Sequence, residues 1–577
     1  MNFAAILGID GLLPLEQLAE PTDPLWLSPE SVAMLVIMVV VTAMALSMVI
    51  VPAMIRLAPA LRMVDQPDPR KVHAQPVARV GGIGIVLGAL VAFLMWGPLT
   101  PLTQAYLFGA VVLFTFGALD DALELGHYPK FVGQFIAVIP VIWYGGLYVS
   151  RFPFFETLDV PVWLCQVFTL VAVVGVINAV NHSDGLDGLA AGEVMLSLIV
   201  VGFFGFLARS LVLIVVVASV VGGVLGFLRY NTHPARVFMG DSGSQFLGFS
   251  VAFAVVYLTQ NANTAMSPAA ALLLLGLPVI DILAVFYLRW KGGMNLFKAT
   301  RNHIHHRLLD LGFSHPESVV VNYAVQAAFV FSAVLLAYER DWLLLGVYLG
   351  AVLAIFSLIT LAERSSWRAH DPDRPRHPHR LLGMQPDDWQ QGVTRAAVSV
   401  LLILVPGYLL VVPVLVTDIP QDFALLSGIL AAVMLAEQLF ARHNNSVAVR
   451  AILYVATLVM VYLWSQYAPA AVRASTALSL IFFGLLVVSV GTAIRFGKRN
   501  PFRVTPTDYL SVFLLLAVAL FQSFSFVGQE FSLLVIKFLV VLYCVEYLSF
   551  RGPAVRTMLH LAASCGLLVL CARALWF

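Results

Sequence analysis

The sequence predicts an all-α fold, that of a polytopic integral membrane protein with roughly eighteen transmembrane helices. Of its 577 residues, 60% are hydrophobic and only 11% are charged, and the mean hydropathy is +0.92. Apolar runs long enough to cross about 30 Å of hydrocarbon recur from residue 32 to the end of the chain. These runs must be helical, because lipid offers the backbone no hydrogen-bond partner.

Composition divides the chain into four parts. Residues 1–31 contain acidic residues but no Lys or Arg, so they lack the basic region of a cleavable signal peptide and are interpreted as an exported N-terminal segment. Residues 32–362 contain about eleven predicted spans and all the polar clusters. A cytoplasmic linker rich in Pro, Arg and His at 363–395 leads to a C-terminal membrane extension, 396–577, with about seven spans and an unassigned role.

Basic residues fall in alternate loops, which the positive-inside rule places in the cytoplasm. The basic residues of these loops include Arg70, Lys71, Lys130, Arg229, Arg236, Arg289, Lys291, Arg301 and Arg307. Every acidic cluster then lies on the cytoplasmic side. The net charge of +1 excludes a broadly basic nucleic-acid surface, so no nucleic acid is expected as a partner.

The first acidic cluster is Asp120–Asp121 at the end of an apolar run, followed by Lys130. Adjacent carboxylates near a membrane need a balancing charge, which a divalent cation, a proton or a Lys partner could supply. A solvated helix end that is capped by these two acidic residues explains the pair equally well.

The second cluster lies in the segment from 178 to 188. Its polar residues, spaced three apart along one side of a helix end, are Asn178, Asn181, Asp184 and Asp187. Gly185 and Gly188 would let the backbone approach a ligand closely. Oxygen-rich groups suit magnesium, whereas an ordinary helix cap needs only one such residue.

The third cluster surrounds Asp241, with Phe238 three residues before it and Gly240, Ser242, Gly243 and Ser244 beside it. Backbone donors at a helix start attract phosphate, and an aromatic ring can stack on a base. The fourth comprises His303, His305, His306 and Arg307, which can bind phosphate or sugar. Alternatively, these histidines could coordinate zinc, although no cysteine or acidic residue lies nearby in the sequence.

The first basic loop, VDQPDPRKVHAQPVARVGG, completes the set of polar segments. It carries Lys71 and ends at a pair of glycines. A substrate role for Lys71 and a basic membrane anchor that simply follows the positive-inside rule fit this loop equally well.

Taken in order, DQPDPRKVH, GALDDALEL, NAVNHSDGLDGLA, YNTHPARVFMGDSGS and HIHH resemble the polyprenyl-phosphate N-acetylhexosamine-1-phosphate transferases over about residues 45 to 365. The resemblance implies a bacterial inner-membrane enzyme with its active site on the cytoplasmic face. Such an enzyme transfers N-acetylhexosamine 1-phosphate from a UDP-N-acetylhexosamine to undecaprenyl phosphate and releases UMP. The HIHH loop is similar to the branch that initiates cell-surface glycans such as lipopolysaccharide O-antigen.

The same resemblance implies residue roles. Asp241, Asp120 and Asp121 would hold Mg²⁺, with Mn²⁺ as an alternative, and Asp184 and His303 join them as catalytic candidates. The substrate-binding candidates are Lys71, Lys130, Asn181, Gly185, Leu186, Asp187, Asn231, Phe238, His305, His306 and Arg307. Five of these, Gly185, Leu186, Asp187, Asn231 and Phe238, match positions that hold uridine. Thr300 stands where the family commonly has Asp, which leaves the sugar selectivity open.

A second hypothesis is a non-catalytic transporter of a lipid-linked sugar, or a glycan-export scaffold. Asp281, Lys537 and Glu546 could mark a pathway across the membrane. The simpler interpretation is a helix–helix hydrogen bond for Asp281 and snorkelling for the other two. For the C-terminal extension we hypothesise docking of a partner from the same glycan pathway, or formation of a homo-oligomer.

Overall fold

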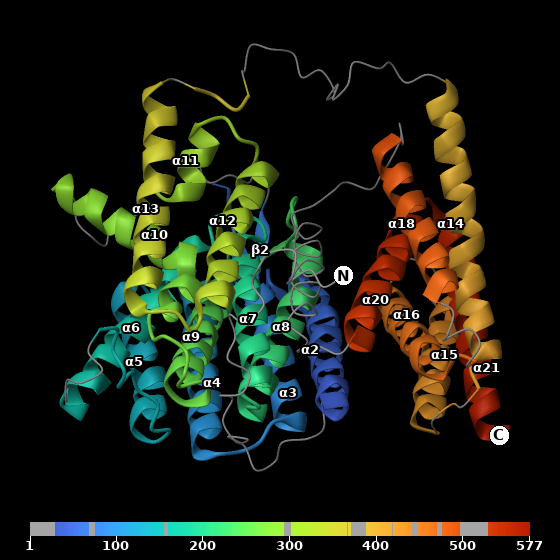
Figure 1. Cartoon of the computed structure of the whole chain (residues 1–577), viewed down its shortest axis with the longest axis horizontal. Helices are drawn as coiled ribbons and strands as arrows, with labels where there is room; N and C mark the ends of the chain where they lie inside the picture. The colour runs from blue at the N-terminus through green and yellow to red at the C-terminus, as the bar shows by residue number, and fades with distance from the viewer. Residues whose placement is uncertain are drawn as a thin grey trace. The chain divides into compact units, whose positions relative to one another are not determined.

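A computed structural model gives the arrangement of the chain (Figure 1). It describes residues 29–67, 76–154, 160–293, 302–365, 367–370, 388–417, 419, 421–440, 447–469, 476–496 and 529–576. The described residues up to 370 belong to one compact unit, the N-terminal unit. Those from 388 onward belong to a second, the C-terminal unit.

Helices make up most of the described structure, and thirteen of them are long and apolar enough to cross a membrane. The all-α, multi-pass membrane fold is therefore confirmed, while the number of roughly eighteen spans stays a prediction. The helices of the N-terminal unit are α2 (Pro29–Leu57), α3 (Gly81–Trp96), α4 (Pro101–Leu123), α5 (His127–Trp143), α6 (Val162–Ser183), α7 (Leu189–Leu207), α8 (Leu211–Asn231), α9 (Asp241–Tyr257), η2 (Leu258–Ala262), α10 (Ala270–Lys291), α11 (Ile304–Asp310), α12 (His315–Leu336) and α13 (Asp341–Arg364).

Helices α7, α8 and α9 form the centre of the N-terminal unit. Between 83% and 89% of their most apolar stretches is buried, compared with 17% for α13. A helix that is apolar on every side can be buried on every side, which is what these three sequences allow. The central helices therefore provide the fixed frame on which the polar ends are mounted.

Glycines bring α8 against α2. A Cβ atom on Gly222 would lie 2.5 Å from the carbonyl oxygen of Val40, and one on Gly226 would lie 2.6 Å from that of Met44. Two small residues four apart allow helix backbones to pack at close range in a membrane, where burial from water no longer drives association. The α2–α8 contact is thus set by backbone proximity.

A small sheet interrupts the helical pattern. Its strands are β1 (Val64–Asp65), β2 (Val77–Arg79) and β3 (Val237–Phe238). Strand β2 pairs antiparallel with β1 and parallel with β3, so that Arg79 lies opposite Phe238. The sheet fixes the ends of the first basic loop beside the segment that leads into Asp241.

The C-terminal unit is a second helical bundle. Its helices within the described residues are α14 (Asp388–Leu415), α15 (Gln421–Phe440), α16 (Val447–Tyr467), α18 (Thr476–Phe496), α20 (Gln529–Ser549) and α21 (Pro553–Trp576). Helix α13 continues to Arg364 and α14 starts at Asp388, so both ends of the predicted linker are helical. Helices extend past their apolar stretch because Glu, Arg and Gln are themselves good helix formers.

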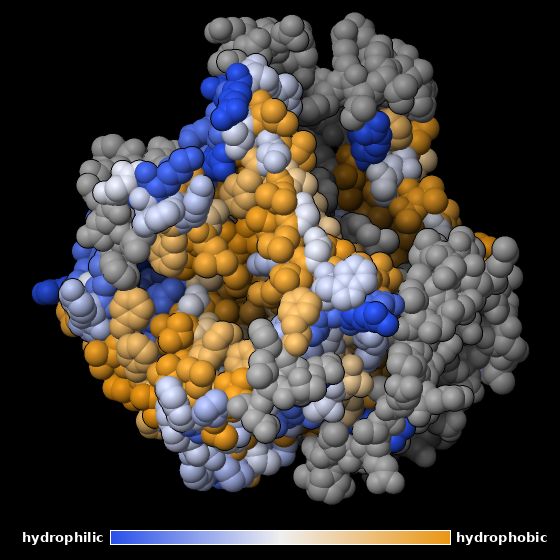
Figure 2. Space-filling model, turned by 60° about the vertical axis from the view of Figure 1, so that its left-hand side comes forward, coloured by the Kyte–Doolittle hydropathy of each residue, from blue (hydrophilic) through white to orange (hydrophobic). Residues whose placement is uncertain are grey.

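The outer surface matches a lipid environment. The face shown in Figure 2 is largely apolar, with hydrophilic residues gathered toward its margins. Large apolar side chains such as Phe135 and Ile139 of α5 and Leu353 and Leu358 of α13 are exposed. In water such surfaces would drive association, whereas in a bilayer they face hydrocarbon.

Candidate active site

The candidate active site is built around a lysine held between two aspartates. Lys130 Nζ of α5 lies 2.8 Å from Asp120 Oδ2 of α4 and also forms an ion pair with Asp241 Oδ2 at the start of α9. Asp120 is 8% exposed, and its Oδ1 is buried without a hydrogen-bond partner among the described residues. Three helices therefore bring two carboxylates to one cation, with one carboxylate oxygen still unsatisfied.

Asp121, the neighbour of Asp120, has a different environment. Its Oδ1 accepts the backbone N–H of Asp241 at 2.8 Å, and its Oδ2 accepts that of Ser242 at 3.1 Å. Gly117 permits this contact, because a Cβ there would lie 2.5 Å from the Ser242 backbone. Asp121 thus caps α9, and its role as a metal ligand stays a prediction.

The start of α9 also differs from its predicted role. The N–H groups of Asp241 and Ser242 donate to Asp121, and those of Gly243 and Ser244 donate to the carbonyl of Gly240. The first four N–H groups of a helix are the ones that bind phosphate. Here protein oxygens already occupy them, so phosphate must meet other donors.

A chain of side-chain amides supports Asp241. Asn181 Nδ2 donates to Asp241 Oδ1 at 3.2 Å and to Ser244 Oγ at 2.7 Å. Gln245 Nε2 lies 3.4 Å from Asp241 Oδ2, and Gln134 donates to Gln245 at 3.2 Å. The amides hold the carboxylate in place without neutralising its charge. Gln134 and Gln245 were absent from the predicted site.

The loop between α6 and α7 contributes the remaining acids. Loss of water around Asp184, together with the charges of Asp241, Asp121 and Asp187, raises the pKa of Asp184 to about 7. This carboxyl therefore changes protonation near neutral pH, whereas an ordinary Asp does not. Perturbed carboxyls of this kind are common at catalytic centres.

Asp187 sits in a histidine-lined corner. Its Oδ2 lies 2.8 Å from His233 Nδ1 and accepts the N–H of Ala235 at 3.0 Å, while its own N–H donates to His315 Nε2 at 3.2 Å. The two imidazoles stack with ring centroids 4.2 Å apart. Burial alone would raise the pKa of Asp187, but the hydrogen bond from His233 and the other partners outweigh it and lower that pKa.

The ligand atoms of Asp187, His233 and His315 are close enough together to surround a metal ion. However, His315 Nε2 already accepts a backbone N–H, and its buried Nδ1 has no acceptor among the described residues. Metal-ligating histidines usually donate their second nitrogen to such an acceptor. The geometry therefore supports a hydrogen-bonded corner that keeps Asp187 ionised.

Other residues predicted to hold uridine surround this corner. Asn231 accepts the N–H of Gly188 and donates to the carbonyl of Val237, both at 2.8 Å, so its amide ties the loop to β3. Phe238 is half-buried in β3, and Leu186 is buried. The family resemblance assigned all these positions to uridine binding. In the structure Asn231 joins two of the segments through its hydrogen bonds to Gly188 and Val237.

The histidine segment closes over the same loop. His305 is buried, and its Nε2 has no hydrogen-bond partner among the described residues. A Cβ on Gly185 would lie 2.3 Å from that Nε2, so glycine is required for this contact. Burial, with the neighbouring His306 and His303, lowers the pKa of His305 well below its usual range. His305 is therefore neutral at physiological pH.

Two further residues of this segment pair with neighbouring helices. Arg307 makes two 2.8 Å hydrogen bonds to Glu363 of α13, and its contact with a diphosphate stays a prediction. His303 Nδ1 lies 2.6 Å from Asp281 of α10, which the sequence analysis left outside the site. Lys71 and Thr300 lie outside the described residues.

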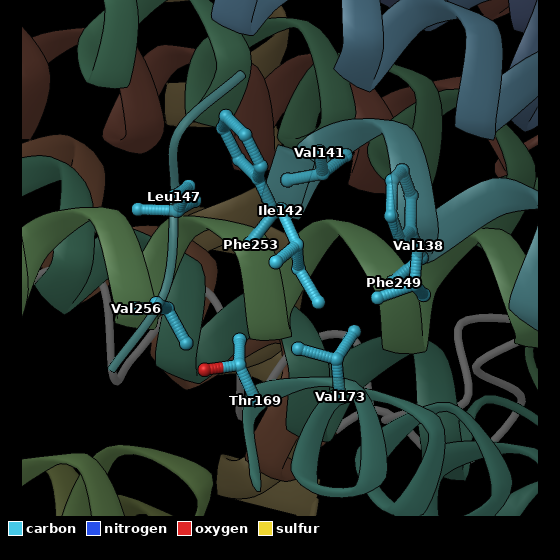
Figure 3. Close-up of a pocket in the computed structure, with 9 residues that line it drawn as sticks. All are labelled: Val138, Val141, Ile142, Leu147, Thr169, Val173, Phe249, Phe253 and Val256. Carbon is cyan, nitrogen blue, oxygen red and sulfur yellow. The ribbon is translucent and has the colours of Figure 1, made fainter. Parts of the chain in front are cut away.

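A pocket elsewhere in the N-terminal unit lies between α5, α6 and α9 (Figure 3). Its lining is apolar except for Thr169, and includes Val138, Ile142 and Phe249. A diphosphate needs charged or hydrogen-bonding partners, so this pocket is not the candidate site.

Comparison with known proteins agrees with the geometry. Residues 103–259 match the family model of glycosyl transferase family 4. The chain is 33% identical over 315 residues to the probable undecaprenyl-phosphate N-acetylglucosaminyl 1-phosphate transferase of Bacillus subtilis (strain 168), covering 54% of the chain and 87% of that relative.

Two more relatives show the same extent of similarity. The undecaprenyl-phosphate alpha-N-acetylglucosaminyl 1-phosphate transferase of Escherichia coli O157:H7 is 30% identical, with 52% of the chain and 84% of the relative covered. The decaprenyl-phosphate N-acetylglucosaminephosphotransferase of Mycobacterium tuberculosis (strain CDC 1551 / Oshkosh) is 32% identical, with 55% and 86% covered. These matches confirm the resemblance seen in the motifs.

Proposed function

The chain belongs to the polyprenyl-phosphate N-acetylglucosamine-1-phosphate transferases of glycosyl transferase family 4. It therefore transfers a sugar 1-phosphate to a polyprenyl phosphate, and we propose the following complete reaction for it. The donor is a UDP-N-acetylhexosamine and the acceptor is undecaprenyl phosphate. An oxygen of the lipid phosphate bonds to the β-phosphorus as the bond to the bridging oxygen breaks. UMP leaves with that oxygen, and the lipid diphosphate sugar starts a cell-surface glycan.

The observation that carries this proposal is the meeting of Lys130 with Asp120 and Asp241. The ammonium group of Lys130 contacts both carboxylates, and the Oδ1 of Asp120, which has no partner among the described residues, is left to accept a second cation. Magnesium in phosphate-transferring enzymes is held by one or two carboxylates together with water and substrate phosphate. The residues present fit that ion, with Asp120 and Asp241 as its holders. Bound there, it would neutralise diphosphate charge.

The protein's own groups would then position the substrates. Lys130 supplies a positive charge to phosphate oxygens, and Asn181 keeps Asp241 oriented through its 3.2 Å hydrogen bond. Asp121 keeps α4 and α9 together, and Asp187 and Phe238 provide a carboxylate and an aromatic ring for the uridine. Phosphoryl transfer depends mainly on such positioning and charge neutralisation.

The active site is proposed to face the cytoplasm of a bacterial inner membrane. Arg229 lies in the last turn of α8, and Arg289 and Lys291 lie in the last turn of α10, where the chain enters the segments that form the site. A basic flank on that side agrees with the positive-inside rule. The non-catalytic transporter hypothesis is not favoured, because the relatives are named as transferases.

The decisive experiment uses the purified full-length protein with undecaprenyl phosphate and a panel of UDP-N-acetylhexosamines. We expect UMP release with one or more donors, dependent on added Mg²⁺ or Mn²⁺ and lost with a chelator. Folded protein that releases no UMP with any donor would refute the proposed reaction. Metal-independent release would refute the metal assignment alone.

A further inference from the structure

Asp281 is a buried carboxylate that the reaction as described above does not use. It lies within α10, whose sequence is apolar enough to cross a membrane, and it is 5% exposed. A carboxylate in such a helix is costly unless a partner compensates it, and it usually marks a functional site.

Among the described residues Asp281 has two hydrogen-bond partners, and both come from the histidine segment. Its Oδ2 lies 2.6 Å from His303 Nδ1, and its Oδ1 accepts the backbone N–H of Ile304 at 2.8 Å. His303 is the residue immediately before α11, and no side chain of α11 itself caps that end. One carboxylate therefore holds both the ring of His303 and the start of its helix.

The carboxylate determines which nitrogen of His303 remains available. Because Asp281 can only accept when ionised, Nδ1 of His303 carries the proton of their hydrogen bond. Nε2 makes no hydrogen bond within the described part of the chain. It is thus the nitrogen left to meet a ligand.

The plane of the ring is fixed as well. His303 stacks on His182 with ring centroids 5.6 Å apart and on His305 at the same separation, with interplanar angles of 24° and 10°. His182 adjoins Asn181, which holds Asp241, and His305 contacts Gly185. The ring of His303 is therefore placed between two segments of the candidate active site.

Other charged groups surround the pair. Asp281 acts electrostatically on His182 of α6 and on Glu193 of α7, while Arg289 of α10 acts on His182. Glu193 is 2% exposed, and its Oε2 has no partner among the described residues. The hydrogen-bonded pair of Asp281 and His303 therefore belongs to a wider group of buried polar residues.

We propose that Asp281 is a positioning residue for the transferase reaction: it fixes the tautomer and orientation of His303 so that Nε2 meets an oxygen of the sugar diphosphate. This inference rests on the proposed function. It also accounts for the intramembrane carboxylate that favoured a transport pathway in the sequence. In metal sites, a carboxylate on the second nitrogen of a histidine orients the ring in the same way, and losing that carboxylate typically costs 10- to 100-fold in metal affinity or activity. We expect a loss of similar size here.

The test is a double-mutant cycle on purified full-length protein, with UMP release as the assay. Asp281→Asn keeps the size of the side chain and leaves no buried charge behind. We expect it to lower kcat roughly 10- to 100-fold with little change in KM, as would His303→Ala. The double variant should be no slower than His303→Ala if the contribution of Asp281 to kcat passes through His303.

Asp341→Asn provides the matched control. Asp341 also accepts a backbone N–H, that of Phe154 at 2.9 Å, and bonds the hydroxyl of Ser267, but it starts α13 away from the polar clusters. We expect the control to lower Tm without lowering kcat.

Independent losses that multiply in the double variant would overturn the inference, as would a fall in Tm that alone explains the lost activity. If Asp281→Asn yields no folded protein, the Asp281→Ala/His303→Ala pair removes both partners and is compared with His303→Ala by the same criterion. A folded wild type that releases no UMP would refute the proposed function and this inference together. If the wild type is active and the losses in kcat of the two single variants multiply in the double variant, only this inference is refuted.

Discussion

The two units of the chain are both bundles of apolar helices, yet they treat their charged residues differently. In the N-terminal unit Lys130 meets carboxylates from two other helices. In the C-terminal unit Lys537 lies over the ring of Phe483 at 5.7 Å, and Glu546 accepts a hydrogen bond from Tyr454. The N-terminal unit is therefore distinguished by charged side chains from three helices that meet at one point, and not by its polar content alone.

The largest effect is expected where that convergence is broken. Asp241→Asn removes a carboxylate that meets Lys130 and Asn181. We expect UMP release to fall by ~10³-fold or more, the scale lost when charge neutralisation of a phosphoryl transfer is removed. Metal titrations of the purified variant would show whether weaker metal binding accounts for the loss. Near-normal turnover would contradict the site assignment.

A smaller loss is expected when the cation itself is removed. Lys130→Met leaves Asp120 and Asp241 facing each other without a positive partner. We expect a fall of ~10²-fold in kcat/KM, as for loss of one charge-stabilising donor. Lys130→Arg is the control that keeps the charge. Equal activity of the Met and Arg variants would show that the charge at residue 130 is unimportant.

His233→Ala should have a milder effect, confined to nucleotide binding. It removes one partner of Asp187 and leaves the Ala235 N–H in place. A hydrogen bond to a charged group contributes about 1.5 kcal/mol, so KM for the UDP-sugar should rise about tenfold with little change in kcat. His370→Ala, which breaks the 2.8 Å contact to Glu317, is the matched control and should change neither parameter. A fall in kcat alone would contradict a uridine-side role.

The smallest effect on chemistry is expected from deleting residues 388–577. All the described contacts of the candidate site lie within the N-terminal unit, so UMP release should be unchanged. If the extension docks a glycan-pathway partner or forms an oligomer, size-exclusion with light scattering should show a smaller complex. Loss of UMP release from a folded truncated protein would show that the extension contributes to the active site. Unaffected glycan assembly in cells, together with an unchanged number of chains per complex, would remove the docking and oligomer hypotheses.

Much of this architecture could be predicted, because lipid leaves the apolar runs no alternative to helices. The polar clusters were also visible, since carboxylates such as Asp120 and Asp241 stand out at the ends of those runs. What the sequence could not show was which partner each polar atom selects. Arg307 bonds Glu363, more than fifty residues away, and Asp281 bonds His303. Such choices depend on tertiary packing, which no local spacing encodes.

The cap that Asp121 places on α9 bears on how the protein would behave without the proposed metal ion. The junction of α4 and α9 is closed by hydrogen bonds of 2.8 and 3.1 Å between a side chain and backbone amides. Protein atoms alone therefore keep the two helices docked. Removing the proposed cation with a chelator should leave the protein folded. Adding the cation back is therefore expected to restore the activity without a refolding step.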